Sequence, residues 1–167
     1  MIGSAEVSGS FDAHAATLIL FARQWLDGAG AEDVVQEAFI SLMGQRRRPD
    51  NVKAWLYKAV RNAAISHARS GSRRAKREMR IAETRYEFFE VRAEDLIDAA
   101  AAQEALSSLA TEQREVIVMR IWAQMTLKEI SEVTGEAVST LFARYRAGLS
   151  QIKRIMESSC LAKKKMS

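Results

Sequence analysis

The chain has 167 residues, 48% of them hydrophobic, with a formal net charge of +4 and an isoelectric point near 9.4. No apolar run of about 18 residues is present, so no membrane-spanning helix is predicted. A single cysteine excludes an internal disulfide, and the start of the chain does not resemble a signal peptide, which together favour a reducing cytoplasm. Abundant helix-forming residues and a single proline predict an all-α fold, and the positive charge favours a polyanionic partner.

Two helices are predicted in the first 43 residues. Residues 1–10 lack periodicity and are expected to be loose, whereas apolar residues recur at helical spacing over 11–26. Residues 28–30, Gly-Ala-Gly, are predicted to form the turn that ends this helix. A second helix is predicted over 31–43, with an apolar stripe of Val34, Val35, Ala38, Phe39 and Leu42. Its opposite face carries Asp33, Gln36 and Glu37.

A basic loop around Pro49 is predicted over residues 46–52, followed by a third helix over 54–69. The helical period turns Leu56, Val60 and Ala64 inward. The same period places four polar side chains along one outward strip, namely Lys58, Arg61, Asn62 and Arg69. This strip is the predicted DNA-contacting face of the first module.

Charge is distributed unevenly along the chain. Residues 46–80 contain twelve basic and two acidic side chains, a net charge of +10, whereas residues 81–104 contain two basic and seven acidic side chains, a net charge of −5. The basic stretch has the density of a polyanion-binding surface. For the acidic stretch two interpretations remain open: a solvated connecting helix, or a segment that folds back on either basic module when DNA is absent.

The last third of the chain contains a helix-turn-helix pattern. Thr126 and Glu129 form a capping box that starts one helix, and Gly135 ends it at positive φ. The second helix is predicted over residues 139–156 and would lie in the major groove of DNA. Its predicted inward stripe is Leu141, Tyr145, Leu149 and Ile152. The side chains left for DNA are Ser139, Thr140, Phe142, Ala143, Arg144 and Arg146.

These features carry a family resemblance. Residues 31–39, followed by 54–57 and 61–65, resemble the second conserved region of extracytoplasmic-function sigma factors. Residues 109–116 and the helix-turn-helix resemble their fourth region. Both regions occur in the expected order, and the resemblance covers most of residues 11–156.

The resemblance implies two small helical domains joined by a linker. They would be a region-two domain over 1–76, an acidic linker over 77–97, a region-four domain over 98–160 and a basic tail over 161–167. Such a factor binds core RNA polymerase, directs promoter recognition and opening, catalyses nothing itself, and is controlled by an anti-sigma protein. The last three lysines, residues 163–165, are expected to be a solvated tail.

The resemblance also implies three sets of contact residues. Polymerase clamp helices would contact Glu32, Asp33, Gln36 and Glu37. The minus-ten strand, whose flipped bases the 45–53 loop would capture, would contact Lys53, Trp55, Lys58, Arg61, Asn62, Arg69, Arg73 and Arg74. The minus-thirty-five duplex would contact Lys128, Ser139, Thr140, Phe142, Arg144 and Arg146, and the same domain would contact the polymerase flap.

At three positions the functional assignment is open or departs from the family pattern. Trp55 has two interpretations, a platform for stacking bases or a core residue. Ser66 stands where the family often has Asp, and Phe142 stands where many members have a basic residue. Phe142 can instead contact a thymine methyl group.

Other classes of protein remain as alternatives. One is a stand-alone helix-turn-helix repressor with a dimerisation or sensor domain, and another is a sigma-like interaction adaptor that binds a regulator but no promoter. A nucleic-acid enzyme would need a carboxylate or metal constellation, which the sequence lacks. No metal or other cofactor is predicted, because His14, His67 and Cys160 lie far apart along the chain.

Overall fold

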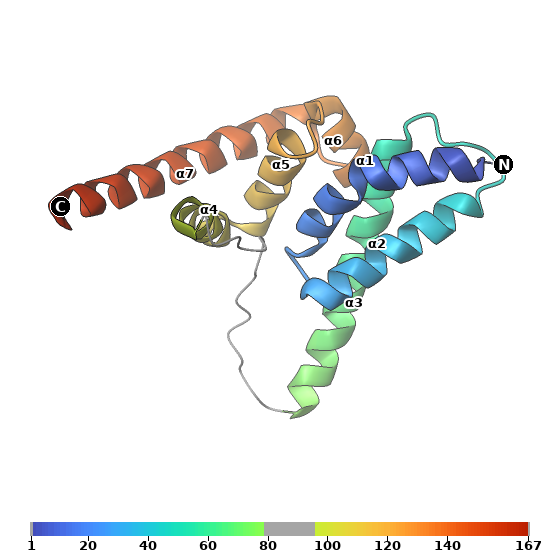
Figure 1. The fold of residues 1–167 in the computed structure, drawn as a ribbon, viewed down its shortest axis with the longest axis horizontal. Coiled ribbons are helices and arrows are strands. Elements are labelled where there is room, and N and C mark those ends of the chain that lie inside the picture. Colours follow the sequence, from blue (N-terminus) through green and yellow to red (C-terminus); the bar gives the residue numbers. More distant parts are fainter. Residues whose placement is uncertain (1, 79–95, 167) are drawn as a thin grey trace. The chain divides into compact units, whose positions relative to one another are not determined.

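The computed structural model describes the backbone of residues 2–78 and 96–166 and the side chains of residues 2–71, 101–162, 164 and 165. All regular structure within these residues is helical, which confirms the all-α prediction (Figure 1). The helices are α1 (Ser4–Ala22), α2 (Gly28–Met43), α3 (Val52–Glu78), α4 (Leu96–Ser108), α5 (Thr111–Ile121), α6 (Leu127–Thr134) and α7 (Val138–Met166). None of the described helices combines the length and apolar character that a membrane span requires.

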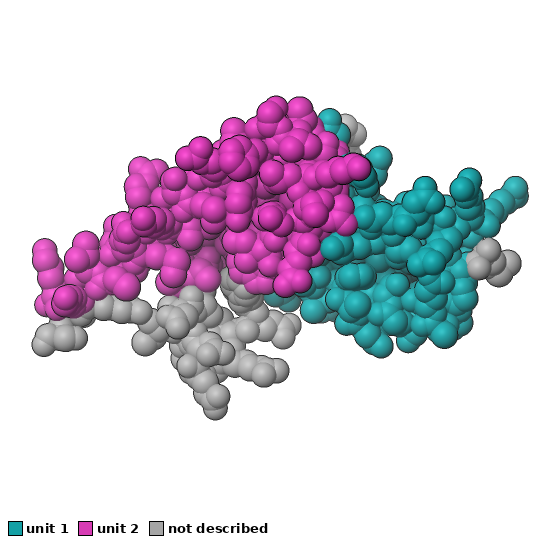
Figure 2. Space-filling view, turned by 90° about the horizontal axis from the view of Figure 1, so that it is seen from above, with its two compact units in different colours: residues 1–86, 132–135 teal, residues 87–131, 136–167 magenta. Residues whose placement is uncertain are grey.

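The chain divides into two compact units, which Figure 2 shows in different colours. Unit 1 consists of residues 1–86 and 132–135, and unit 2 of residues 87–131 and 136–167. The acidic linker expected at 77–97 falls almost entirely outside the described residues.

Helices α1, α2 and α3 of unit 1 pack against one another around an apolar core. Every residue of the predicted α2 stripe is buried, as are Leu56, Val60 and Ala64 of α3. Phe21 lies at the centre of an aromatic cluster, with ring centroids 5.1 Å from Tyr57 and 5.2 Å from Trp25. Burial raises the pKa of the Tyr57 hydroxyl to about 12, although the neighbouring Thr17 hydroxyl opposes the shift.

Residues 4–10 are helical, contrary to the prediction that residues 1–10 are loose. Helix α1 begins at Ser4, and Ile2 and Val7 are buried. An ion pair of 2.8 Å joins Glu6 Oε1 to Arg48 Nε in the loop between α2 and α3. The few apolar residues among the first ten do not recur at helical spacing, so this helical turn depends on tertiary contacts that the sequence pattern does not reveal.

The prediction that Gly28 to Gly30 end the first helix is also wrong. Helix α1 ends at Ala22, and Asp27 is the N-cap of α2, its side chain accepting a hydrogen bond of 2.7 Å from the Gly30 N–H. A Cβ atom at Gly30 would lie 2.9 Å from Asp27 Oδ1, closer than side-chain carbons approach such an oxygen. These glycines therefore form the first turn of α2 and allow its cap to close.

In unit 2, α7 packs against α4 and α5. The capping box is confirmed: the Thr126 N–H donates to Glu129 Oε2 at 2.8 Å, and the Glu129 N–H donates to Thr126 Oγ1 at 3.2 Å. Gly135 has φ 77° and ends α6 as predicted. A hydrogen bond of 2.9 Å from Gln151 Nε2 to the Ser108 carbonyl ties α7 to the end of α4.

Two details of α7 differ from the prediction. Leu149, expected to point inward, is 36% exposed, and Gly148 occupies the inward position. A Cβ atom at Gly148 would lie 3.1 Å from Ile117 Cγ1, so the missing side chain allows α5 to approach α7 closely. Helix α7 also continues to Met166, past the predicted end at residue 156, so residues 161–166 are helical. Likewise α3 extends to Glu78, past the predicted end at residue 69.

Candidate functional site

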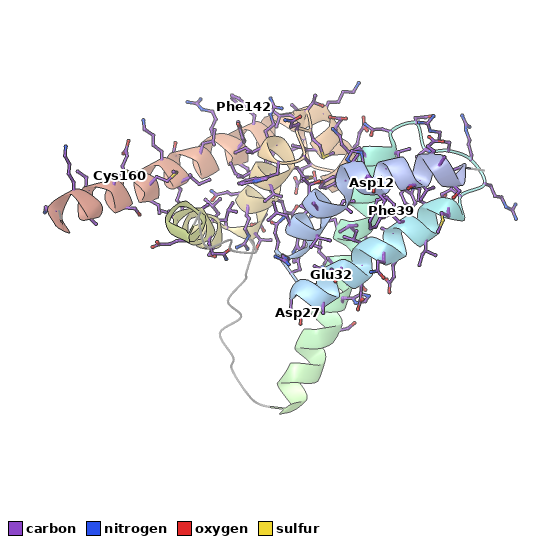
Figure 3. All side chains as sticks on the ribbon, viewed as in Figure 1. Asp12, Asp27, Glu32, Phe39, Phe142 and Cys160 are labelled. Carbon is purple, nitrogen blue, oxygen red and sulfur yellow. The ribbon has the colours of Figure 1, made fainter. Side chains whose placement is uncertain are left out.

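One face of α2 presents the four residues expected to contact polymerase. All four are exposed: Glu32, Asp33, Gln36 and Glu37 (Glu32 is labelled in Figure 3). They lie opposite the buried stripe because the two sets are offset by half a helical turn. Glu37 Oε2 lies 4.0 Å from Nε2 of His67 on α3, a contact that becomes an ion pair when the imidazole is protonated.

Two exposed apolar side chains extend this α2 face. Ile40 is 63% exposed and Met43 is 47% exposed. They follow Gln36 at intervals of four and three residues, so they lie on the same side of the helix. Neither residue belongs to the predicted polymerase-contacting set, although the helical spacing from Gln36 indicates both. An apolar element inside a polar face is typical of protein-binding surfaces.

On α3, the structure brings together three of the predicted DNA-contacting residues. Arg61, Asn62 and Arg69 line a shallow cavity of about 430 Å³, whose other described lining residues are Ile65, Ser66 and Ser70. The helical spacing of these residues places two guanidinium groups, an amide and two hydroxyls on one surface. Such a group combines charges for phosphates with donors and acceptors for bases.

The other predicted residues of this set lie elsewhere on α3. Lys58 is exposed and Trp55 is half-buried, and neither is among the described residues that line the cavity. Lys53 lies in the first turn of α3, where its charge contributes, after burial, to lowering the pKa of His14. Arg73 and Arg74 belong to α3, but their side chains lie outside the described residues.

The loop that connects α2 to α3 is held at both of its ends. Asn51 Oδ1 accepts a hydrogen bond of 2.9 Å from the Ala54 N–H and so caps the start of α3. Gln45 Nε2 donates to the Ser41 carbonyl at 3.1 Å. Together with the ion pair between Glu6 and Arg48, these contacts restrict the conformation of the loop expected to capture bases.

In the helix-turn-helix, Ser139, Phe142 and Arg146 lie on the exposed face at the start of α7. Phe142, which is labelled in Figure 3, is 50% exposed. The Arg146 guanidinium carbon lies 5.8 Å from the centroid of the Phe142 ring, within the range of a cation–π contact. Thr140 is half-buried, and Lys128 is exposed on α6.

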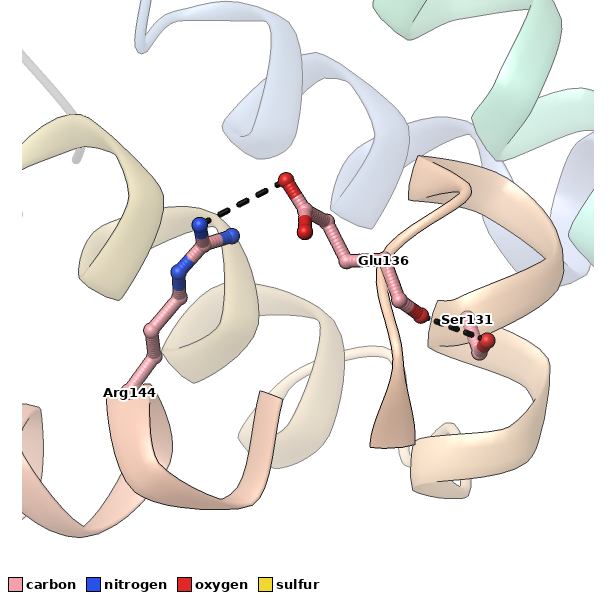
Figure 4. A network of polar contacts seen from close by, with 3 residues as sticks. All are labelled: Ser131, Glu136 and Arg144. Carbon is pink, nitrogen blue, oxygen red and sulfur yellow. Dashed lines mark hydrogen bonds and ion pairs between the residues drawn. The ribbon is translucent and has the colours of Figure 1, made fainter. Parts of the chain in front are cut away.

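Arg144 lies on a different side of α7. Its Nη2 atom is 3.4 Å from Oε1 of Glu136, in the turn between α6 and α7, and its side chain is 28% exposed. The Ser131 hydroxyl of α6 donates to the Glu136 carbonyl oxygen at 2.7 Å, so one turn residue is joined to both helices (Figure 4). Sequence reasoning missed Glu136, because an eight-residue separation across a glycine turn follows no helical period.

No group of three or more His, Cys, Asp or Glu side chains able to hold a metal ion occurs among the described residues. The exposed Cys160 lies on the C-terminal half of α7 (Figure 3), and His14 and His67 are far from it along the chain.

Comparisons with known proteins assign the family. Residues 11–74 match the family model for sigma-70 region 2, and residues 99–152 match the model for sigma-70 region 4. The RNA polymerase sigma factor SigV of Bacillus subtilis is 31% identical to this chain over 122 residues, which cover 70% of each protein. The chain belongs to the extracytoplasmic-function sigma factors.

Solved structures share the fold of this sigma factor. The sigma factor RpoE of Bartonella quintana, crystallised with the anti-sigma factor NepR, has a TM-score of 0.66 and 20% identity, and the match covers 90% of this chain and 97% of RpoE. CnrH, solved with the cytosolic domain of CnrY, has a TM-score of 0.65 and 20% identity. The match covers 93% of this chain and 90% of CnrH.

Family membership decides the general activity. Sigma factors are non-enzymatic transcription initiation factors, and this one binds core RNA polymerase and directs promoter recognition and opening. The presence of both regions, in order, in one chain favours this function over a stand-alone repressor or an adaptor.

Proposed function

We propose that this sigma factor docks on the clamp helices of the largest polymerase subunit through the exposed face of α2. The observation that carries this proposal is the common exposure of Glu32, Asp33, Gln36 and Glu37 on the side of α2 opposite the core. Carboxylate and amide groups accept hydrogen bonds from Arg and Lys of a partner. The apolar Ile40 and Met43 beside them add area that excludes water.

The minus-ten strand would bind along α3 and the loop before it. Arg61 and Arg69 supply charge for phosphates, and Asn62 between them supplies donors and acceptors for an unstacked base. Ser66 in the same cavity leaves this surface without the negative charge of an aspartate. Lys53, Lys58, Arg73 and Arg74 would add phosphate contacts, and the half-buried Trp55 exposes only part of its ring for stacking.

The minus-thirty-five duplex would bind the helix-turn-helix, with the start of α7 in the major groove. Ser139, Thr140, Phe142 and Arg146 would face the bases, and Lys128 on α6 would face a phosphate. Arg144 would hold the turn through Glu136 instead of contacting a base. The same domain would contact the polymerase flap. We place the region-two domain at residues 1–76, the linker at 77–97 and the region-four domain at 98–160.

Regulation by an anti-sigma factor also belongs to the proposal. It is supported by the structural likeness to RpoE, which was crystallised with the anti-sigma factor NepR. Such a partner would cover polymerase-binding surfaces and so compete with polymerase. This factor would act in the bacterial cytoplasm, where polymerase and promoters are found, and would itself catalyse no reaction.

The test is run-off transcription with purified core polymerase on sheared genomic DNA of the source organism, with and without this protein. New discrete start sites that depend on the protein are the expected result, and their upstream sequences would reveal both promoter elements. A folded protein that binds no core polymerase would contradict the proposal and would favour the repressor or the adaptor.

A further inference from the structure

The exposed face at the start of α7 has an unusual chemistry for a DNA-contacting surface. Its side chains are those of Ser139 and of Phe142, Ala143 and Arg146, which follow Ser139 at helical distances of three, four and seven residues. Arg146 is the one arginine on this face, because Arg144 lies on the flank beside Glu136. The face therefore combines one guanidinium group with apolar surface.

Phe142 provides most of that apolar surface. Its side chain is 50% exposed, and Val138, one helical turn earlier, is 46% exposed. Covering this exposed aromatic ring with an apolar group is favourable, because it removes apolar surface from water. In the major groove of DNA, the C5-methyl group of thymine is the apolar group that base pairs present.

Arg146 is positioned by the same ring. Its guanidinium carbon lies 5.8 Å from the Phe142 centroid, so the cation–π contact holds the planar group beside the ring. A guanidinium fork donates two parallel hydrogen bonds to N7 and O6 of guanine, and ordering the fork beforehand reduces the entropy lost on binding.

The spacing of the two side chains then limits which bases they reach. Residues four apart on a helix have Cβ atoms about 5–6 Å apart, and successive bases of a DNA strand are about 3.4 Å apart along the axis. We infer that the stacked pair of Phe142 and Arg146 recognises a thymine and a guanine in neighbouring base pairs of the upstream promoter element. This inference rests on the proposed function and specifies the DNA sequence that the region-four site prefers.

The first experiment selects DNA with the complete holoenzyme, formed from core polymerase and the full chain. Duplexes randomised over the upstream element, with a fixed downstream region, would be enriched by binding and sequenced. We expect thymine and guanine at neighbouring positions. Enrichment of a defined element that lacks this pair would overturn the inference while leaving the proposed function intact. If holoenzyme forms but enriches no upstream sequence, both the inference and the proposed binding of the upstream element are contradicted.

The second experiment removes single chemical groups from the enriched duplex. Replacing the thymine by deoxyuridine deletes only the methyl group, and we expect an affinity loss of about fourfold for the wild type. Phe142→Ala should bind both duplexes equally. Replacing the guanine by 7-deazaguanine deletes the N7 acceptor, which should weaken the wild type but leave Arg146→Ala unaffected.

Controls separate recognition from folding. Deoxyuridine placed at a thymine outside the element should leave wild-type affinity unchanged. Both substituted residues are exposed, so the variants should retain the helicity and the polymerase affinity of the wild type. Equal wild-type affinity for the thymine and deoxyuridine duplexes would overturn the role of Phe142. The same conclusion would follow if Phe142→Ala preferred the thymine duplex as strongly as the wild type does.

Discussion

The functional faces of α2 and α3 differ from that of α7 in how they are determined. On α2 and α3 the residues that the helical period turns inward are buried, and the polar residues between them are exposed or line one shallow cavity. On α7 the two arginines expected to contact DNA lie on different sides: Arg146 stacks on Phe142, and Arg144 pairs with Glu136. On α7 the helical period alone therefore does not decide which arginine is available to DNA, because the preceding turn supplies a partner for Arg144.

The largest expected effect concerns the α2 face. Asp33→Lys combined with Glu37→Lys should weaken binding of core polymerase on the order of 100-fold or more, because like charges facing each other cost several kcal/mol. Affinity for core polymerase and far-ultraviolet circular dichroism of the variant would be measured together. The matched control is Asp12→Lys with Glu112→Lys, which makes the same charge change at exposed positions of α1 and α5. Unchanged polymerase affinity at unchanged helicity would contradict the assignment of this face.

The core of unit 1 should be sensitive to high pH through Tyr57. Its pKa is raised from 10.0 to about 12, so the unfolded chain loses the proton first and stability falls between pH 10 and about pH 12. The loss should reach roughly 3 kcal/mol at the upper end of this range. Well below pH 10 the phenol is protonated in both the folded and the unfolded state, so no loss of stability is expected there. Urea unfolding as a function of pH would measure it, and Tyr57→Phe should remove this component of the slope. A wild type and variant with parallel pH profiles would show that the phenol ionises equally in both states.

The packing of α5 against α7 should make stability sensitive to the size of the side chain at residue 148. Because a Cβ atom there would already lie 3.1 Å from Ile117, Gly148→Val should destabilise the protein by about 1–3 kcal/mol. The neighbouring exposed Ala147→Val is the control, since it also introduces a β-branched side chain but without the close contact. Urea unfolding midpoints of the two variants would be compared. Equal midpoints would show that α5 and α7 have room for the larger side chain.

The smallest effect is expected from the ion pair between Glu136 and Arg144. A partly exposed pair at 3.4 Å should contribute no more than about 1 kcal/mol, measured by a double-mutant cycle on unfolding. Exchanging the charges, with Glu136→Arg and Arg144→Glu together, should restore most of the binding to the upstream element that each single change loses. An exchanged protein that remains as weak as Arg144→Glu alone would show that Arg144 contacts DNA directly.

The starts of helices α1 and α2 differ from their predicted positions for a common reason. The start of α1 depends on burial of Ile2 and Val7 and on an ion pair from Glu6 to a loop more than forty residues away. The first turn of α2 contains glycines that are unfavourable for a helix until the Asp27 side chain caps it. In each case a side chain outside the local periodic pattern decides where the helix begins.

The sequence alone determined the helical class, the capping box at Thr126 and Glu129, and the turn at Gly135, because these depend on local periodicity and backbone preference. The two family regions were also evident from the sequence, through their resemblance to known sigma factors. The polar and apolar sides of α2 follow from the same periodicity. Only the tertiary structure decided that Gly148 lies against Ile117 and that Arg144 pairs with Glu136. Close packing and ion pairing depend on distances between segments that are separate in the chain, and a residue pattern does not contain those distances.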